Sequence, residues 1–362
     1  MSAAGTPANA QKRRPASLKK RILTALAVVL AVIAIIAGSI AIELRSHVVV
    51  WQQASWWPTH ILPAGFVTPL HMTEYPLPTA GAGATSIVRG PDGALWFTEP
   101  GADKIGRITT SGVVTEFLIP AGSQPGGLAV GADGNLWFTA PPLNLIGRLT
   151  PAGAVTEFPL PILDSLPGSI VAGPDGNLWF TEVIRIGRIT PSGVISNFPV
   201  SAGAGPNGIV VAPDGNLWFT DSDVGRLGYV TPAGAVTEVG DARQFGPGAI
   251  TVGPDHALWF VDTTHNRIVR MTLRGAITEF GVPSSGSVLT GITAGPDGAL
   301  WFTELFSNNI GRLTTNGHVT EYPVPTPNSG PAGITVGPDG NLWFTEASGD
   351  KIGRIVPGEA AH

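Results

Sequence analysis

The chain has 362 residues, a formal net charge of −5 and a charged fraction of 13%, with 48 glycines, 33 prolines and no cysteine. The lack of cysteine excludes a fold held by disulfide bonds, and the regular spacing of glycine and proline in turns excludes a low-complexity chain. The length is ample for a buried core.

The first 42 residues have the pattern of a membrane-targeting signal. Residues 1–21 carry six basic and no acidic side chains, and 22–42 follow with 21 uncharged, mostly apolar residues. A run of that length can span a bilayer, and flanking basic residues stay in the cytoplasm. We therefore expect a basic cytoplasmic tail at 1–21, a transmembrane helix at 22–42 acting as a signal-anchor, and a single-pass protein whose remainder is extracytoplasmic. Small residues at 37–39 leave a cleaved signal as the alternative.

The segment at 43–65 is expected to be a juxtamembrane linker. Its three tryptophans, Trp51, Trp56 and Trp57, either anchor at the membrane interface or pack against the domain beyond.

After residue 21 the chain carries 15 basic and 26 acidic side chains. This acidic balance argues against nucleic acid as a partner.

A phrase of the form GPDGNLWFTE occurs seven times from residue 90 onward. Its copies occupy 90–99, 131–140, 173–182, 212–221, 253–262, 295–304 and 337–346. Successive tryptophans in these copies are 41, 42, 39, 41, 42 and 42 residues apart. A repeat of this period is one supersecondary unit that buries its apolar face against its neighbours.

Each repeat contains four short strand patterns separated by turn residues. In the last two copies these patterns lie at 309–314, 318–325, 332–337 and 341–346. Four strands in about forty residues is typical of a β-propeller blade. The last copy lacks its fourth strand, which the phrase MTEYPLP at 72–78 can supply. We therefore predict an all-β, seven-bladed β-propeller over 66–356, closed by an N-terminal outer strand, monomeric, with a short tail at 357–362.

Several repeated residues are interpreted as structural. The tryptophans form the core between blades, and the aspartate of each PDG turn is interpreted as a turn former rather than a metal ligand. The arginine of each IGR phrase is expected to pair between blades with a fourth-strand glutamate; Arg107 and Glu116 are examples of the two residues. Tyr229 replaces this arginine in the fourth repeat, and the pattern gives no reason for it.

Acidic residues close the second strand of six repeats. Because a first strand begins where its antiparallel neighbour ends, these positions share one end of every blade. We therefore expect a binding rim at one mouth of the central channel, formed by Glu99, Glu182, Asp221, Asp262, Glu304 and Glu346, with His265 in an adjacent loop. Carboxylates at close range raise one another's pKa values or recruit a cation, whereas the alternative is a set of solvated strand ends.

The phrases GPDGNLWFTE, KIGRIT and VTEFPLP together resemble the virginiamycin B lyases, or streptogramin lyases, over about 72–356. The resemblance implies a seven-bladed propeller and, for the founding activity, Mg²⁺-dependent opening of a cyclic depsipeptide by β-elimination. It also implies a site of two histidines, in PHGI phrases of the last two blades, and the glutamate that ends the second strand of the last blade. One histidine removes a proton, while the other holds the metal with the glutamate.

The sequence departs from this family pattern at both histidines. The glutamate falls on Glu346, but the metal-binding histidine falls on Thr290, in LTGI, and the base on Ala332, in PAGI. Neither threonine nor alanine removes a proton at neutral pH, and only Glu346 and Thr290 are left as ligands for Mg²⁺. We therefore expect a propeller that binds a peptide, glycan or protein at the channel mouth. The alternative is a carbon–oxygen lyase of the streptogramin lyase type.

Overall fold

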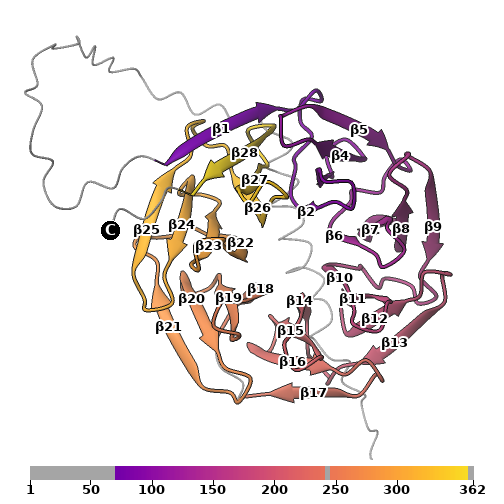
Figure 1. The fold of residues 1–362 in the computed structure, drawn as a ribbon. Coiled ribbons are helices and arrows are strands. Elements are labelled where there is room, and N and C mark those ends of the chain that lie inside the picture. Colours follow the sequence, from indigo (N-terminus) through magenta and orange to yellow (C-terminus); the bar gives the residue numbers. More distant parts are fainter. Residues whose placement is uncertain (1–69, 241–244, 358–362) are drawn as a thin grey trace, which may run out of the picture. The chain divides into compact units, whose positions relative to one another are not determined.

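The computed structural model describes residues 70–240 and 245–357. They form seven four-stranded antiparallel sheets arranged around a central channel as the blades of a propeller (Figure 1). Blades 1 to 7 are numbered here by the repeat that supplies their second strand. The predicted all-β, seven-bladed propeller is therefore confirmed.

The first strand of each blade lies next to the channel and the fourth strand lies outermost (Figure 1). The first strands are β2 (Ile87–Arg89), β6 (Leu128–Val130), β10 (Ile170–Ala172), β14 (Pro206–Val211), β18 (Pro247–Val252), β22 (Leu289–Ala294) and β26 (Pro331–Val336). The second strands are β3 (Leu95–Glu99), β7 (Leu136–Ala140), β11 (Leu178–Glu182), β15 (Leu217–Asp221), β19 (Leu258–Asp262), β23 (Leu300–Glu304) and β27 (Leu342–Glu346). A short 3-10 turn, η1 (Pro141–Leu143), follows β7.

The third strands are β4 (Lys104–Ile108), β8 (Leu145–Leu149), β12 (Arg185–Ile189), β16 (Arg226–Val230), β20 (Arg267–Met271), β24 (Asn309–Leu313) and β28 (Lys351–Val356). The fourth strands are β5 (Val114–Leu118), β9 (Val155–Pro159), β13 (Ile195–Pro199), β17 (Val236–Val239), β21 (Ile277–Gly281), β25 (Val319–Pro323) and, in blade 7, β1 (His71–Pro76).

The ring is closed by β1, as the sequence predicted. This strand pairs antiparallel with β28, from His71 opposite Val356 to Pro76 opposite Lys351. Glu74 of β1 also accepts hydrogen bonds from the backbone N–H and hydroxyl of Thr326 in blade 6, at 2.8 and 2.7 Å. β1 thereby covers the edge of β28 at the junction of the first and last repeats.

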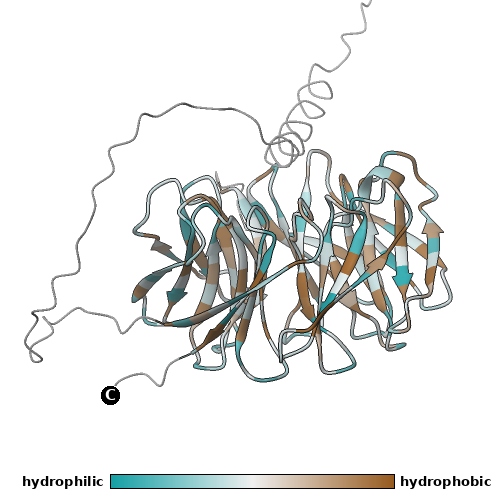
Figure 2. Ribbon diagram, turned by 90° about the horizontal axis from the view of Figure 1, so that it is seen from above, coloured by the Kyte–Doolittle hydropathy of each residue, from teal (hydrophilic) through white to brown (hydrophobic). Residues whose placement is uncertain are grey.

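The LWFTE strands are buried on both faces because each is enclosed by two neighbouring blades. Trp96 packs on blade 2, against Leu136 and Phe138, whereas Phe97 packs with Trp343 of blade 7. All seven repeat tryptophans are at most 2% exposed. Hydrophobic residues accordingly recur along the strands through the body of the ring (Figure 2). The predicted tryptophan core is thus confirmed.

The aspartate of the PDG turn organises its own blade. Asp92 accepts hydrogen bonds from the indole Nε1 of Trp96 at 3.0 Å and the backbone N–H of Ala94 at 3.3 Å, and it pairs with Arg107 Nε at 2.6 Å. The expected pairing of Arg107 with a fourth-strand glutamate is therefore wrong. In the β4–β5 register Glu116 lies opposite Gly106, one residue from Arg107, so Arg107 and Glu116 project from opposite faces.

A belt of buried threonines joins neighbouring blades near the channel. Each threonine precedes the last residue of its second strand and donates to a backbone carbonyl of the next blade; the hydroxyl of Thr220, for example, lies 2.8 Å from the Gly248 oxygen. The same hydroxyl accepts the N–H of Gly208 at 2.8 Å. The members are Thr98, Thr139, Thr181, Thr220, Thr303 and Thr345. Val261 interrupts the belt between blades 5 and 6.

In residues 70–240 and 245–357, no helix is long and apolar enough to cross a membrane. The predicted span at 22–42 and the linker tryptophans lie outside the described residues, so these expectations remain predictions.

Candidate functional site

The six predicted carboxylates lie at one end of the ring, where second strands end and third strands begin. None of them is at the surface. Glu99, Asp262, Glu304 and Glu346 are 0% exposed, and Asp221 and Glu182 are 1% and 2% exposed. This burial excludes the alternative of solvated strand ends, because the acids lie beneath the loops of this mouth. Their role as a binding rim stays a prediction.

Strand alternation explains the burial. The last residue of LWFTE shares a face with the phenylalanine two positions earlier, and that face packs on the preceding blade. Gly106 of β4 lies beneath both side chains: a Cβ atom there would be 2.1 Å from the Phe97 ring and 2.8 Å from Glu99 Oε1. The glycine of each IGR phrase thus provides the space for the phenylalanine ring, and in blade 1 also for the glutamate.

Asp262 in blade 5 is the best-satisfied member of the set. Its Oδ1 accepts the backbone N–H of Gly246 at 2.9 Å, and its Oδ2 binds His265 Nδ1 at 2.9 Å and Arg267 Nε at 2.8 Å. Burial raises the pKa of Asp262, but these donors outweigh it and hold the pKa below its usual range. Arg267 also pairs with Glu279 at 2.6 Å, so the cluster is an internal ion network.

Asp221 and Glu182 each have a basic neighbour. Asp221 accepts the N–H of Gly205 at 2.8 Å, and Arg226 Nε lies 3.6 Å from its other oxygen. Glu182 pairs with Arg185 at 3.3 Å, yet burial raises its pKa further than Arg185 lowers it. Among the described residues, these two carboxylates and Asp262 are the ones of the set that have arginine partners.

The glutamates of blades 6, 7 and 1 accept no hydrogen bond on either oxygen within the described part of the chain. Burial raises the pKa of Glu99 to about 8, reinforced by the negative charge of Glu116. Burial likewise raises the pKa of Glu304 and of Glu346 to about 7, and the nearby charges of Glu321 and Glu74, respectively, act in the same direction.

The serines closest to two of these carboxylates are engaged elsewhere. Ser287, near Glu304, donates its hydroxyl to the Ser284 carbonyl at 2.6 Å, and Ser329, near Glu346, donates to Asn308 Oδ1 at 3.0 Å. These carboxyls therefore hold a proton more readily than ordinary glutamates do.

The residues at the family's histidine positions lie at the junction of blades 6 and 7. The hydroxyl of Thr290 contacts Thr303 Oγ1 at 2.9 Å and lies 3.2 and 3.3 Å from the carbonyl oxygens of Pro331 and Ala332. Thr290 is thus part of the hydrogen bonding between two inner strands. Ala332 contributes no titratable side chain.

A metal ion finds few ligands at this junction. Across residues 70–240 and 245–357, no three side chains of His, Cys, Asp or Glu are grouped as a metal site would require. Glu346 supplies one carboxylate, and the Thr290 hydroxyl is already used. Because Mg²⁺ needs a set of oxygen ligands in near-octahedral geometry, these residues do not fit a resident Mg²⁺ site.

The sequence reasoning missed an apolar surface on the same end of blades 2 and 3, which we call the apolar loops. Its residues lie in the turns after β7 and β11 and in the connection between β9 and β10. They are between 36% and 83% exposed and comprise Leu143, Ile162, Leu163, Leu166, Val183 and Ile184. In the sequence this surface is indicated by the segments PILDSL at 161–166 and VI at 183–184, because the corresponding loops of other repeats contain mainly Gly, Ser, Asp and Asn.

Hydrogen bonds hold the apolar loops together. The side chain of Asn144 donates to the Ile162 carbonyl at 2.8 Å and accepts the Ser165 N–H at 2.9 Å, and Val183 donates its N–H to the Ser165 carbonyl at 3.0 Å. The next blades present polar groups at the same end, including the exposed Asp223 and the His265 imidazole, which is 39% exposed. This mouth is therefore apolar over blades 2 and 3 and polar over blades 4 and 5.

The fold and this mouth define a seven-bladed β-propeller with a candidate site at one end of the channel. The sequence matches the Virginiamycin B lyase family over residues 64–241 and 185–361, so the protein belongs to that family.

Three solved structures agree with this assignment. A streptogramin B lyase is 37% identical with a TM-score of 0.75, covering 79% of this chain and 97% of that one. A selenomethionine form of virginiamycin B lyase from Staphylococcus aureus is 38% identical, with the same TM-score of 0.75, over 79% of this chain and 99% of the other. A catalytically inactive histidine-to-alanine variant of the S. aureus enzyme with quinupristin is 39% identical, again with a TM-score of 0.75 and coverage of 79% and 99%.

Proposed function

We propose that this protein is a binding member of the family that does not open streptogramin rings. The replacement of both implied histidines, by Thr290 and Ala332, carries the proposal. Proton abstraction next to a carbonyl needs a base within hydrogen-bond reach, and neither replacement is one. The inactive histidine-to-alanine variant of the S. aureus enzyme supports this, because that single change abolishes catalysis there.

The ligand that the mouth favours is a peptide with apolar side chains, linear or cyclic. The apolar loops expose six aliphatic side chains on adjacent connections, and exposed apolar clusters of this kind mark binding surfaces. The polar groups of blades 4 and 5 offer hydrogen bonds at the same end. A ligand that carries both aliphatic side chains and amide groups complements both sectors.

We further propose that the segment 22–42 holds the propeller on the outer side of a membrane. The support is the uncharged run of 21 residues preceded by six basic side chains. Protease treatment of intact cells should digest the propeller and spare an N-terminal tag. Protection of the propeller until the membrane is permeabilised would contradict this orientation.

Catalysis is tested with the full chain in lipid nanodiscs, incubated with Mg²⁺ and quinupristin. Ring opening by β-elimination leaves the mass unchanged, so the products are followed by chromatography. The protein with the natural sequence should leave the quinupristin ring closed. The double variant Thr290→His/Ala332→His is the matched comparison, in which both implied histidines are restored. Ring opening by the natural chain that disappears in Glu346→Gln would overturn the proposal and establish the lyase alternative.

Binding is tested with quinupristin as the peptide-type probe, by calorimetry on the same sample. Leu163→Asp places a charge in the apolar loops, and we expect about tenfold weaker binding. Val194→Asp is the matched control, because Val194 is 62% exposed but lies in a turn at the opposite end of blade 3. Equal effects of the two changes, or no measurable binding, would reject the assignment of the ligand to this mouth.

A further inference from the structure

The turns between third and fourth strands share a contact across the blade boundary. In five of the six such turns described, an aromatic ring of the preceding blade's fourth strand covers the turn glycine. A Cβ atom on these glycines would lie between 2.1 and 3.1 Å from the ring. The pairs are Tyr75 with Gly112, Phe117 with Gly153, Phe158 with Gly193, Phe198 with Gly234 and Phe280 with Gly317.

Gly275, in blade 5, is the exception. No atom lies within 4 Å of the position that its Cβ would occupy. The preceding blade ends its fourth strand with Val239, in VTEV, where the fourth strands of the other blades have phenylalanine or tyrosine. The boundary between blades 4 and 5 thus lacks one aromatic ring that its counterparts contain.

The same substitution explains Tyr229. In the other blades the repeat tryptophan stacks on its own fourth-strand aromatic, as Trp137 does on Phe158 at a centroid distance of 5.3 Å. Val239 cannot stack, and the ring of Tyr229 lies over Trp218 at 5.0 Å instead. Blade 4 has therefore moved its aromatic ring from the fourth strand to the third, where the arginine of the IGR phrase normally stands.

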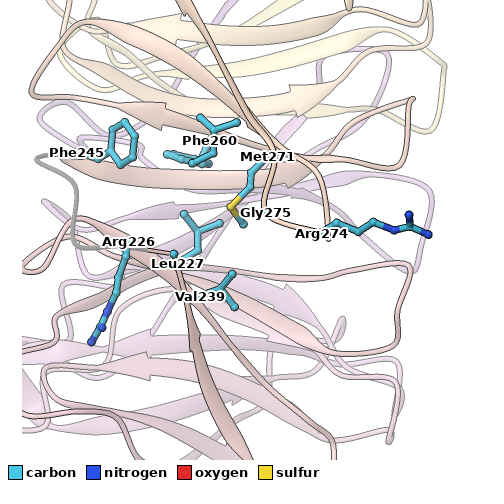
Figure 3. A pocket seen from close by; sticks show the side chains of 10 residues that line it. Arg226, Leu227, Val239, Phe245, Phe260, Met271, Arg274 and Gly275 are labelled. Atoms are coloured by element: carbon cyan, nitrogen blue, oxygen red, sulfur yellow. The ribbon is translucent and has the colours of Figure 1, made fainter.

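The position vacated at residue 239 is a cavity. It measures about 310 Å³ and lies between blades 4 and 5 (Figure 3). Its lining combines two arginines and two glycines with six apolar side chains, and comprises Arg226, Arg274, Gly240, Gly275, Leu227, Val239, Phe245, Phe260, Met271 and Ile277. The side chains of Arg226 and Arg274 extend away from it in different directions (Figure 3), and Arg226 is engaged with Glu238 at 2.5 Å.

We propose that this cavity is a binding site for a small molecule that carries one benzyl-type ring. The counterpart positions hold a phenyl or phenol ring over a turn glycine, so the space has the shape that such a ring fills. Apolar cavities of smaller size, about 150 Å³, bind benzene in other proteins.

This site differs from the apolar loops of blades 2 and 3, because it lies between blades 4 and 5. It runs along the outer part of that blade boundary, from Gly275 in the turn between β20 and β21 to Arg226 and Phe245 at the end of the buried carboxylates. Failure of peptide binding at the mouth would leave the proposal of a ring-binding cavity intact. Failure of toluene binding in the cavity would likewise leave the proposal of peptide binding intact.

The test uses Met271, which lines the cavity, as a reporter. The chain has three methionines, so a ¹³C-methyl-methionine label in the full chain in nanodiscs gives few signals. Toluene, the analogue of the phenylalanine side chain, should shift the Met271 signal saturably, with a dissociation constant on the order of 0.1–1 mM. Met72, in β1, is the internal control and should not move.

Two variants decide whether the shift reports this cavity. Val239→Phe fills the space and should abolish the toluene response; Tyr229→Arg/Val239→Phe restores the common repeat pattern and serves if the single variant does not fold. A Met271 signal that does not saturate with toluene, or that responds equally after Val239→Phe, would overturn the proposal.

Discussion

Blades 5 and 6 are neighbours with nearly the same repeat, yet their buried carboxylates are in opposite states. Asp262 in blade 5 has a histidine, an arginine and a backbone N–H as partners. Glu304 in blade 6 is equally buried, but the position of Arg267 is taken by Asn309, and neither of its oxygens accepts a hydrogen bond among the described residues. The pKa of Asp262 is lowered, whereas burial raises that of Glu304 to about 7.

The comparison shows which features the repeat determines. The repeat places a carboxyl at the end of every second strand except that of blade 2, but the hydrogen-bond donors around that carboxyl decide whether its pKa is lowered or raised. The belt of threonines adds a second contrast, because Thr303 of blade 6 joins it while Val261 of blade 5 does not.

The largest expected effect is that of Asp262→Asn. The change leaves His265 and Arg267 without their shared acceptor, and breaking a buried ion pair typically costs about 3–5 kcal/mol. Because Arg267 is partly exposed and keeps Glu279, we expect the lower end of that range at pH 7, measured by chemical unfolding followed by tryptophan fluorescence. Glu304→Gln in blade 6 is the matched control and should cost less than about 1 kcal/mol at pH 6. Equal losses of unfolding free energy in the two variants would contradict the predicted difference between Asp262 and Glu304.

The second prediction concerns pH. Because burial raises the pKa of Glu304 from 4.5 to about 7 in the folded protein, its contribution to stability is full below pH 4.5 and is lost as the pH rises through 7. Glu304→Gln cannot ionise, so its stability relative to the natural chain should rise by roughly 2–3 kcal/mol between pH 5 and 8.5. The measurement is the difference in unfolding free energy across this range. A difference that stays constant with pH would show that Glu304 titrates normally.

The smallest effect is expected from Val261→Thr, which extends the threonine belt to the boundary of blades 5 and 6. The new hydroxyl would accept the Ala249 N–H and donate to the Thr290 carbonyl, as Thr220 does with Gly208 and Gly248 in blade 4. One such hydrogen bond adds about 0.5–1.5 kcal/mol, which should appear as a higher melting temperature. Thr220→Val is the reciprocal control and should lower it. A destabilised Val261→Thr protein would mean that the boundary is packed differently from the others.

The sequence predicts the fold almost completely because the information is periodic. Strand positions, blade number and the closing role of MTEYPLP all follow from the spacing of the repeats, and each is observed. The positions of the carboxylates along the strands were also predictable. Their burial was not, because it depends on which face of LWFTE meets the preceding blade, and that is settled only by packing.

The arginine pairing and the cavity show the same limit in different ways. Arg107 and Glu116 are both present in the repeat, but their register places them on opposite faces, which spacing alone does not reveal. The exchange of aromatic residues at Tyr229 and Val239 was visible by aligning the repeats. The cavity that results was not predictable, because repeat alignment does not reveal that the fourth-strand ring covers the turn glycine of the next blade.

The closing pair of β1 with β28 has a consequence for biosynthesis. Residue 71 leaves the ribosome 285 residues before its partner, residue 356, so β1 waits without a partner while every other strand pairs with a strand adjacent to it in the sequence. An unpaired strand is a template for association with other chains. Assembly of this protein should therefore be most vulnerable during late translation, and factors that shield nascent chains should act on the segment around β1.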